Sequence, residues 1–164
     1  MNICRKTVGL KVGALSVLLL ALIVGVLPAS ADEDNRVVNW LTYREAMSAG
    51  EAQDKPILLH FTASYSALTR KMRRETYQDP QVIRYLNGNF AVAMVDIAQL
   101  PSLARKFKVE SVPVLWFLDA AGKGLTSIEG EVGPAKMLRV TEYINLKIYE
   151  HTNYDTWLDK RTAR

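Results

Sequence analysis

Apolar residues occur along the chain in two patterns, short continuous runs and stripes at helical spacing. The runs at residues 57–61 and 90–97 are almost wholly apolar, which is typical of buried strands in a sheet that helices cover on both sides. Two further runs, 113–118 and 125–131, flank a turn sequence at residues 120–123 and indicate a hairpin. The pattern therefore predicts four strands, of which the last two are paired.

The segments between these runs have helical character. In the segment 67–76, Leu68 and Met72 are expected on the inner face of a helix. Asp79 and Pro80 form a typical helix start before the next apolar stripe. The predicted helices span residues 41–53, 67–76, 79–89, 101–108 and 133–148. Helices that alternate with strands and end in a hairpin predict an α/β fold, with a mixed central sheet flanked by helices.

The length of 164 residues, without an internal repeat or a linker, is that of one folded domain. We expect this domain at residues 32–149. Residues 150–164 are polar and are expected to form a loose C-terminal tail, although Tyr154, Trp157 and Leu158 could dock on the domain.

Residues 1–31 are typical of a secretory signal peptide. Basic residues precede an apolar stretch at 12–27, and Ala29-Ser30-Ala31 offers the small side chains that a signal peptidase accepts. The stretch is shorter than the ~20 residues of a membrane-spanning helix, and an uncleaved N-terminal anchor is the alternative. Cleavage near Ala31 and Asp32 would place the protein in the periplasm or outside the cell. Membrane contact is expected only if the leader is uncleaved.

Charge and cysteine content exclude several function classes. The net charge is +4, but removing the three basic residues of the leader from the 21 Lys and Arg leaves 18 against 17 Asp and Glu, so no nucleic-acid partner is expected. The single cysteine, Cys4, lies in the leader, and the mature chain from Asp32 onward has no thiol. Thiolate-bound metals and iron–sulfur clusters are therefore excluded, and two separate histidines, His60 and His151, do not indicate a metal site. No cofactor is expected.

Four segments, taken in order, resemble the thioredoxin superfamily, and within it the periplasmic thioredoxin-like domains. Residues 55–65 resemble the strand and loop that lead into the family's redox site, and residues 79–82 resemble the second half of its interrupted helix. Residues 108–113 resemble the approach to the family's cis-proline, and residues 119–123 resemble its hairpin turn. The resemblance covers residues 40–148 and implies a thioredoxin-like fold.

The family's catalytic motif, Trp-Cys-x-x-Cys-Lys, corresponds to residues 65–70, where Ser66 and Thr69 replace both cysteines. Thiol–disulfide exchange needs a thiolate that attacks a sulfur atom, and a hydroxyl group cannot form the mixed disulfide. The sequence therefore predicts a degenerate redox site that contains no catalytic residue for dithiol chemistry.

His60 occupies the position at which many family members keep a buried acid that assists the reactive cysteines. Because His60 lies on a predicted strand just before Phe61, we expect its side chain in the core, as a structural histidine with satisfied hydrogen bonds. The alternative is a non-redox enzyme in which His60 is the general base for Ser66. That chemistry would also need a group that orients the imidazole and an oxyanion hole.

The resemblance also implies a cis bond between Val112 and Pro113, which would turn the backbone of Val112 toward Ser66. The N–H and C=O of Val112 could then pair with an extended peptide, with Tyr65 as an aromatic contact. Trp116 lies within a predicted strand and is expected in the core. A solvated helix face, rather than a site for an acidic partner, is expected for Arg70, Lys71, Arg73, Arg74 and Arg84.

Together these observations predict an exported, redox-inactive thioredoxin-like protein that acts as a binding, assembly or chaperone-like module for a protein or peptide in the cell envelope. The expected binding residues are Tyr65, Ser66, Val112 and Pro113. Two alternatives stay open. One is an enzyme, either a thiol–disulfide oxidoreductase by fold only or a non-redox activity at Ser66 and His60. The other is a structural subunit of an envelope complex.

Overall fold

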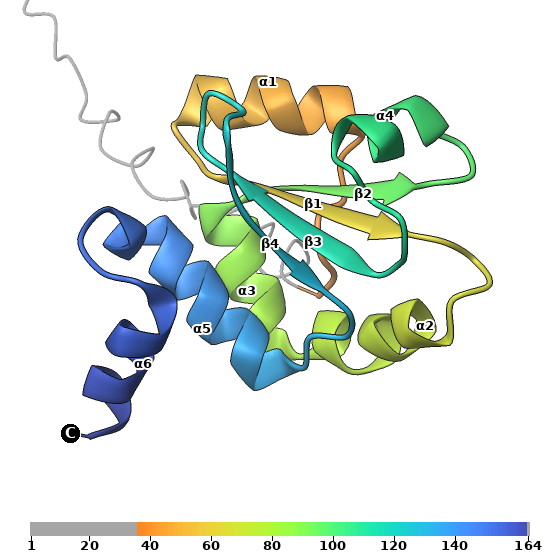
Figure 1. Ribbon diagram of the computed structural model, residues 1–164. Helices are drawn as coiled ribbons and strands as arrows, with labels where there is room; N and C mark the ends of the chain where they lie inside the picture. The colour runs from red at the N-terminus through yellow and green to blue at the C-terminus, as the bar shows by residue number, and fades with distance from the viewer. Residues whose placement is uncertain (1–35, 164) are drawn as a thin grey trace, which may run out of the picture.

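The computed structural model describes residues 36–163, so the predicted leader lies outside the described residues. Figure 1 shows helices on both sides of a central sheet. In chain order the elements are α1 (Tyr43–Gln53), β1 (Ile57–Thr62), α2 (Ala67–Arg74), η1 (Thr76–Gln78), α3 (Pro80–Asn89), β2 (Ala91–Asp96), α4 (Pro101–Lys106), β3 (Val114–Leu118), β4 (Gly124–Glu129), α5 (Pro134–Asn145), η2 (Ile148–Glu150) and α6 (Tyr154–Thr162). Within the described residues no helix is long and apolar enough to cross a membrane.

The four strands form one mixed sheet, as predicted, and their order in it is β2-β1-β3-β4. β1 and β2 are parallel, and both the β1–β3 and the β3–β4 pairs are antiparallel. β2 lies at one edge, where Leu41 forms a parallel bridge with Ala93. β4 lies at the other edge, and its register against β3 shifts between Phe117 and Leu118. This shift makes β4 irregular near Leu125.

Two hydrophobic clusters pack on the two faces of the sheet. Figure 1 shows α1 and α4 over one face and α2, α3 and α5 over the other. The first, which we call the α1/α4 cluster, includes Ala46, Ile57, Leu59, Phe61, Ala93, Val95 and Leu118. The second, the α3/α5 cluster, includes Leu58, Met72, Tyr77, Val82, Leu86, Leu115, Phe117, Met137 and Ile144. Because successive side chains of a strand point to opposite faces, β1 contributes to both clusters in turn.

Helix α2 presents a different face to the core from the one that we predicted. Met72 is fully buried as expected, but the side chain of Leu68 is 44% exposed. Thr69 is buried instead, because it lies three residues before Met72 and shares its side of the helix. The prediction for Leu68 was wrong because a helix this short has room for few inward positions.

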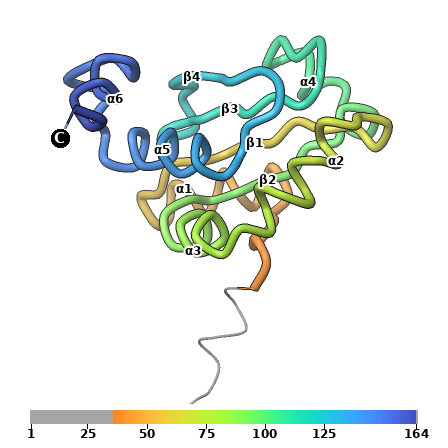
Figure 2. The backbone as a smooth tube through the Cα atoms, turned by 90° about the horizontal axis from the view of Figure 1, so that it is seen from below, coloured from red at the N-terminus to blue at the C-terminus, as the bar shows by residue number. Residues whose placement is uncertain are grey.

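The C-terminal residues are not the loose tail that we expected. They form η2 and α6, and Figure 2 shows α6 at the end of the molecule farthest from α2. Tyr154 and Trp157 pack against the α3/α5 cluster, with their rings 5.4 and 5.5 Å from that of Tyr143. Arg161 forms an ion pair with Glu142 of α5. The two aromatic rings hold this polar segment on the domain.

Candidate functional site

The degenerate motif lies where β1 leads into α2, and Ser66 determines its local geometry. Ser66 is the N-cap of α2, and its hydroxyl oxygen accepts a hydrogen bond from the N–H of Thr69 at 3.2 Å. The same hydroxyl donates to the carbonyl oxygen of Val112 at 3.4 Å. Serine is a favoured N-cap because its oxygen satisfies one of the free N–H groups at a helix start. The hydroxyl of Ser66 therefore stabilises the start of α2 and its contact with the loop at Val112.

The neighbours of Ser66 differ sharply in exposure. The side chain of Tyr65 is 72% exposed, whereas that of Ser66 is 8% and that of Thr69 is 3% exposed. The hydroxyl oxygen of Thr69 has no hydrogen-bond partner within residues 36–163. The two positions that carry cysteine in the family are thus buried in this chain. The exposed ring of Tyr65 directly precedes them in the chain.

Val112 and Pro113 lie next to this helix start. Their peptide bond is cis, and Pro113 is buried. The carbonyl oxygen of Pro113 accepts a hydrogen bond from the N–H of Gly130 at 2.9 Å, which ties this loop to the end of β4. The N–H of Val112 donates no hydrogen bond within residues 36–163. The structure therefore brings Ser66, Val112 and Pro113 together, with Tyr65 adjacent in the chain.

His60 points into the core as predicted, but it is not the satisfied histidine that we expected. It is fully buried on the side of the α3/α5 cluster, and its ring centroid lies 6.1 Å from that of Trp40 and 5.3 Å from that of Tyr77. Neither ring nitrogen has a hydrogen-bond partner within residues 36–163. Burial lowers the pKa of His60 to about 4, so the ring is neutral at pH 7. The sequence pattern could not reveal this, because the neighbouring rings come from distant segments.

No hydrogen bond joins His60 to Ser66, so the structure does not form the nucleophile–base pair of the enzyme alternative. The other histidine, His151, is exposed at the end of η2. Within the described residues no group of three or more His, Cys, Asp and Glu side chains could hold a metal ion.

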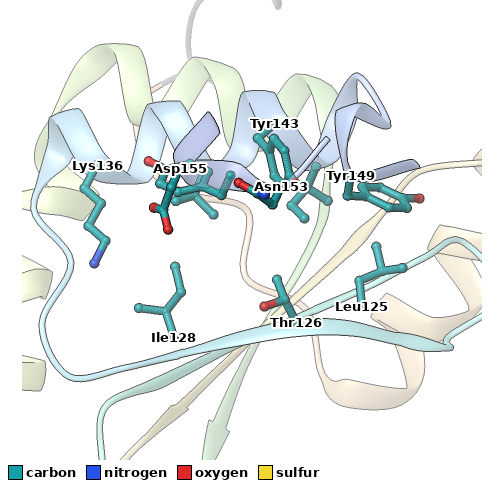
Figure 3. Close-up of a pocket in the computed structure, with 11 residues that line it drawn as sticks. Leu125, Thr126, Ile128, Lys136, Tyr143, Tyr149, Asn153 and Asp155 are labelled. Atoms are coloured by element: carbon teal, nitrogen blue, oxygen red, sulfur yellow. The ribbon is translucent and has the colours of Figure 1, made fainter. Parts of the chain in front are cut away.

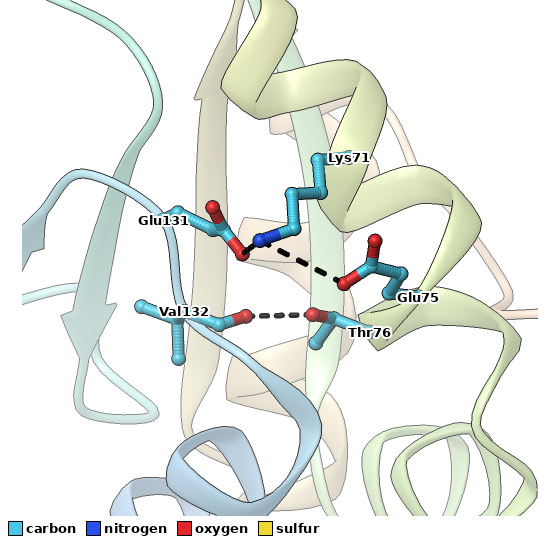
Figure 4. Close-up of polar contacts among 5 residues, drawn as sticks. All are labelled: Lys71, Glu75, Thr76, Glu131 and Val132. Atoms are coloured by element: carbon cyan, nitrogen blue, oxygen red, sulfur yellow. Dashed lines mark hydrogen bonds and ion pairs between the residues drawn. The ribbon is translucent and has the colours of Figure 1, made fainter.

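A polar clamp holds α2 against the loop that precedes α5 (Figure 4). The ammonium group of Lys71 lies 2.8 Å from a carboxylate oxygen of Glu131 and 4.0 Å from one of Glu75. Glu131 raises the pKa of Lys71. Below this pair, the hydroxyl of Thr76 donates to the carbonyl oxygen of Val132 at 2.6 Å. We expected Lys71 to belong to a solvated face, and its pairing with Glu131 could not be predicted because the two residues are far apart in sequence.

Trp116 does not belong to the surface at Tyr65. It is half-buried against the α1/α4 cluster, with its ring 5.5 Å from that of Phe107. The expectation of a core position is therefore confirmed.

A separate pocket of about 480 Å³ lies between β4, α5 and α6. Figure 3 shows Tyr143 and Tyr149 above Leu125 and Ile128, with Lys136 at one side. None of the predicted site residues lines this pocket.

The fold and this geometry agree with the comparison to known families. Residues 43–145 match the family described as thioredoxin-like domain. The chain belongs to this thioredoxin-like family. No curated protein is significantly similar to it.

Solved structures agree with the family assignment. A DsbH oxidoreductase is 25% identical with a TM-score of 0.61, and the match covers 74% of this chain and 92% of that one. A thioredoxin from Thermus thermophilus is 24% identical with a TM-score of 0.60, covering 66% and 87%. The DsbD C-terminal domain of Neisseria meningitidis, in its reduced form, is 20% identical with a TM-score of 0.52, covering 60% and 90%. The last two likenesses establish the fold alone.

This thioredoxin-like chain has one cysteine, at position 4, outside the described domain. Because an intramolecular disulfide needs two cysteines, a single chain cannot carry out dithiol–disulfide exchange.

Proposed function

We propose that this protein is an exported thioredoxin-like binding module, which holds a segment of a partner protein in the cell envelope without covalent chemistry. The contact surface is formed by Tyr65, Ser66, Val112 and Pro113, and we call it the Ser66 surface. The basis for export is the leader-like segment at residues 1–31.

One observation carries this proposal. The hydroxyl of Ser66, at a position where the family has a reactive cysteine, makes hydrogen bonds within the protein, whereas a nearby backbone donor makes none within the described residues. Ser66 bonds to Thr69 and to Val112, but the N–H of Val112 has no acceptor within the described residues. Tyr65 directly precedes Ser66 in the chain, and 72% of its side chain is exposed. A site without a nucleophile has thus kept the features of a contact surface.

These features match a known way of recognising an extended chain. The N–H of Val112 can donate to a carbonyl oxygen of a partner segment, as an edge strand does when a peptide pairs with it. The ring of Tyr65 can cover an apolar side chain of the same segment and keep its hydroxyl in water. Because no bond to sulfur forms, release depends only on these noncovalent contacts.

The enzyme alternative has no comparable support. A serine nucleophile needs a base within about 2.6–3.2 Å, and both nitrogens of His60 lack a hydrogen-bond partner. The hydroxyl of Ser66 instead donates to a backbone carbonyl.

Site-specific photo-crosslinking tests the proposed contact. A photoreactive phenylalanine analogue replaces Tyr65 in one variant and Leu146 in the control, since Leu146 is 59% exposed and follows α5. We expect an envelope protein to crosslink from position 65 and not from position 146. We also expect unlabelled wild-type protein, but not the variant Tyr65→Ser, to compete for this product. Equal products from both positions, or full competition by Tyr65→Ser, would contradict the proposal.

Cell fractionation tests export separately. The full chain should be recovered from the envelope fraction, with a mature N-terminus near Asp32. Recovery of the intact chain from the cytoplasm would show that the export part of the proposal is wrong.

A further inference from the structure

A hollow of about 420 Å³ opens at the carboxyl ends of β1 and β2, and it is separate from the Ser66 surface. Thr62 and Asp96, which are register partners at these strand ends, both line it. Figure 1 shows β1 and β2 ending on the side of the molecule where α2 and α4 lie. The crevice outside the carboxyl ends of strands is where open α/β sheets commonly bind ligands. The volume is in the range of small-molecule sites, roughly 300–1,000 Å³.

Two arginines of α2, Arg70 and Arg73, line this hollow. Arg70 is held in place because one of its terminal nitrogens donates to the carbonyl oxygen of Ser64 at 3.0 Å. Arg73 lies almost one turn further along the helix and takes part in no ion pair or hydrogen bond within residues 36–163. Its guanidinium group therefore keeps all of its donors available.

Tyr43 adds a neutral donor at the start of α1. Its hydroxyl oxygen accepts a hydrogen bond from the ammonium group of Lys106 at 3.3 Å. Within the described residues that hydroxyl donates to no acceptor, so its proton is free to bond a ligand.

One acidic residue, Asp96, lines the same hollow. One of its oxygens accepts the N–H of Ala98 at 2.8 Å. Neither Arg70 nor Arg73 lies within ion-pair distance of it, although all three line one hollow. Two basic residues and one acidic residue give the lining a net positive charge, and none of the three forms an ion pair within residues 36–163.

We propose that this hollow binds a small ligand through an oxyanion, either a carboxylate or a phosphate group. Arg73 is the principal contact, and Arg70 and Tyr43 are supporting donors. A guanidinium group suits this role because its planar fork of N–H groups matches two oxygens of a carboxylate or phosphate. The site does not depend on the proposed function, because neither Ser66 nor Val112 lines the hollow.

The test is an NMR titration of the purified protein, which follows the side-chain Nε–Hε signals of its arginines. Sodium succinate and sodium phosphate are the two probes, at constant ionic strength maintained with sodium chloride. We expect saturable shifts of the Arg73 signal with at least one probe, and the stronger probe identifies the oxyanion. The variant Arg73→Gln should weaken that binding at least tenfold. Arg73→Lys, which keeps the charge but loses the fork, should give an intermediate affinity.

Arg74→Gln is the matched control, because Arg74 is exposed on the same helix and does not line the hollow. This variant should change the affinity less than twofold, and Tyr65→Ser should leave it unchanged. Thermal unfolding of each variant checks that the fold is intact. Three results would overturn the proposal. The shifts could fail to saturate, sodium chloride alone could reproduce them, or Arg73→Gln and Arg74→Gln could weaken binding equally.

Discussion

The two faces of the sheet differ in what they bury, and strand β1 shows the difference residue by residue. Toward α1 and α4 it directs Ile57, Leu59 and Phe61, which are all apolar and fully buried. Toward α3 and α5 it directs Leu58 and then His60, whose two nitrogens have no partner within the described residues. On the first face, β1 contributes only apolar side chains to the core. On the second face, it also buries a polar side chain that has no hydrogen-bond partner within the described residues.

Tyr77 continues this contrast. Its hydroxyl is buried without a hydrogen-bond partner in the described part of the chain, next to His60. Burial of such a group without a bond costs about 1–3 kcal/mol of the free energy of unfolding. The face under α2 therefore carries a cost that the α1/α4 face avoids. In relatives with two reactive cysteines, an acid at the position of His60 has a task, and here that task is absent.

The largest effect is expected on the apolar face. Phe61→Ala should lower the free energy of unfolding by about 3–5 kcal/mol, because it removes a fully buried ring from the α1/α4 cluster. Urea unfolding followed by circular dichroism measures this loss. The exposed Tyr65→Ala is the control and should change stability by less than about 0.5 kcal/mol. Equal losses would contradict the assigned packing.

The second effect is a loss of stability in acid that is due to His60. Its pKa is lowered from 6.5 to about 4 in the folded protein, so the unfolded chain takes up a proton first as the pH falls. The free energy of unfolding should therefore have its full value above pH 6.5 and decrease as the pH falls from 6.5 to 4. The total decrease due to His60 should be about 3 kcal/mol. Urea unfolding at several pH values measures the loss.

His60→Leu should remove this part of the pH dependence and raise stability at pH 7, because no unpaired nitrogen is left in the core. If His60→Leu had the wild-type acid loss, the neutral buried state of His60 would be wrong.

Smaller changes in stability, of opposite sign, are expected when a hydrogen-bonded and an unbonded hydroxyl group are removed. Tyr77→Phe should raise the free energy of unfolding by about 1 kcal/mol, because burial without a partner disfavours the hydroxyl. Thr76→Val should lower it by a similar amount, because it removes the donor to Val132. Thermal and urea unfolding of the two variants give the signs. The same sign in both would show that hydrogen bonding does not distinguish these neighbours.

The smallest effect on stability is expected where cysteines are restored. Ser66→Cys combined with Thr69→Cys should change the free energy of unfolding by less than about 1 kcal/mol, the usual scale of an N-cap change. Residues three apart in a helix are neighbours, so the two thiols should oxidise to an intramolecular disulfide. Thiol counting by mass spectrometry after mild oxidation measures this. Ser66→Cys with Leu68→Cys is the control, since Leu68 points to solvent and should not bridge.

The sequence was sufficient for most of the framework. The apolar runs identified all four strands, and the motif order identified the family, because both signals are local. Leu68 was misplaced because the inward face of a helix of only eight residues depends on its cap at Ser66 and on the loops around it. The docking of α6 was left open because two aromatic residues in a polar segment do not show where they will pack. The hollow at Arg73 is formed by four separate segments, so no local pattern indicates it.

The two edges of the sheet bear on how this chain behaves at high concentration. Straight, unpaired strand edges recruit strands from other molecules and lead to aggregation. Here Leu41 pairs across the outer edge of β2, donating its N–H to Val92 at 2.8 Å, and the register shift at Leu118 interrupts β4. Neither edge offers a long regular template, so copies of this chain have little means of joining their sheets.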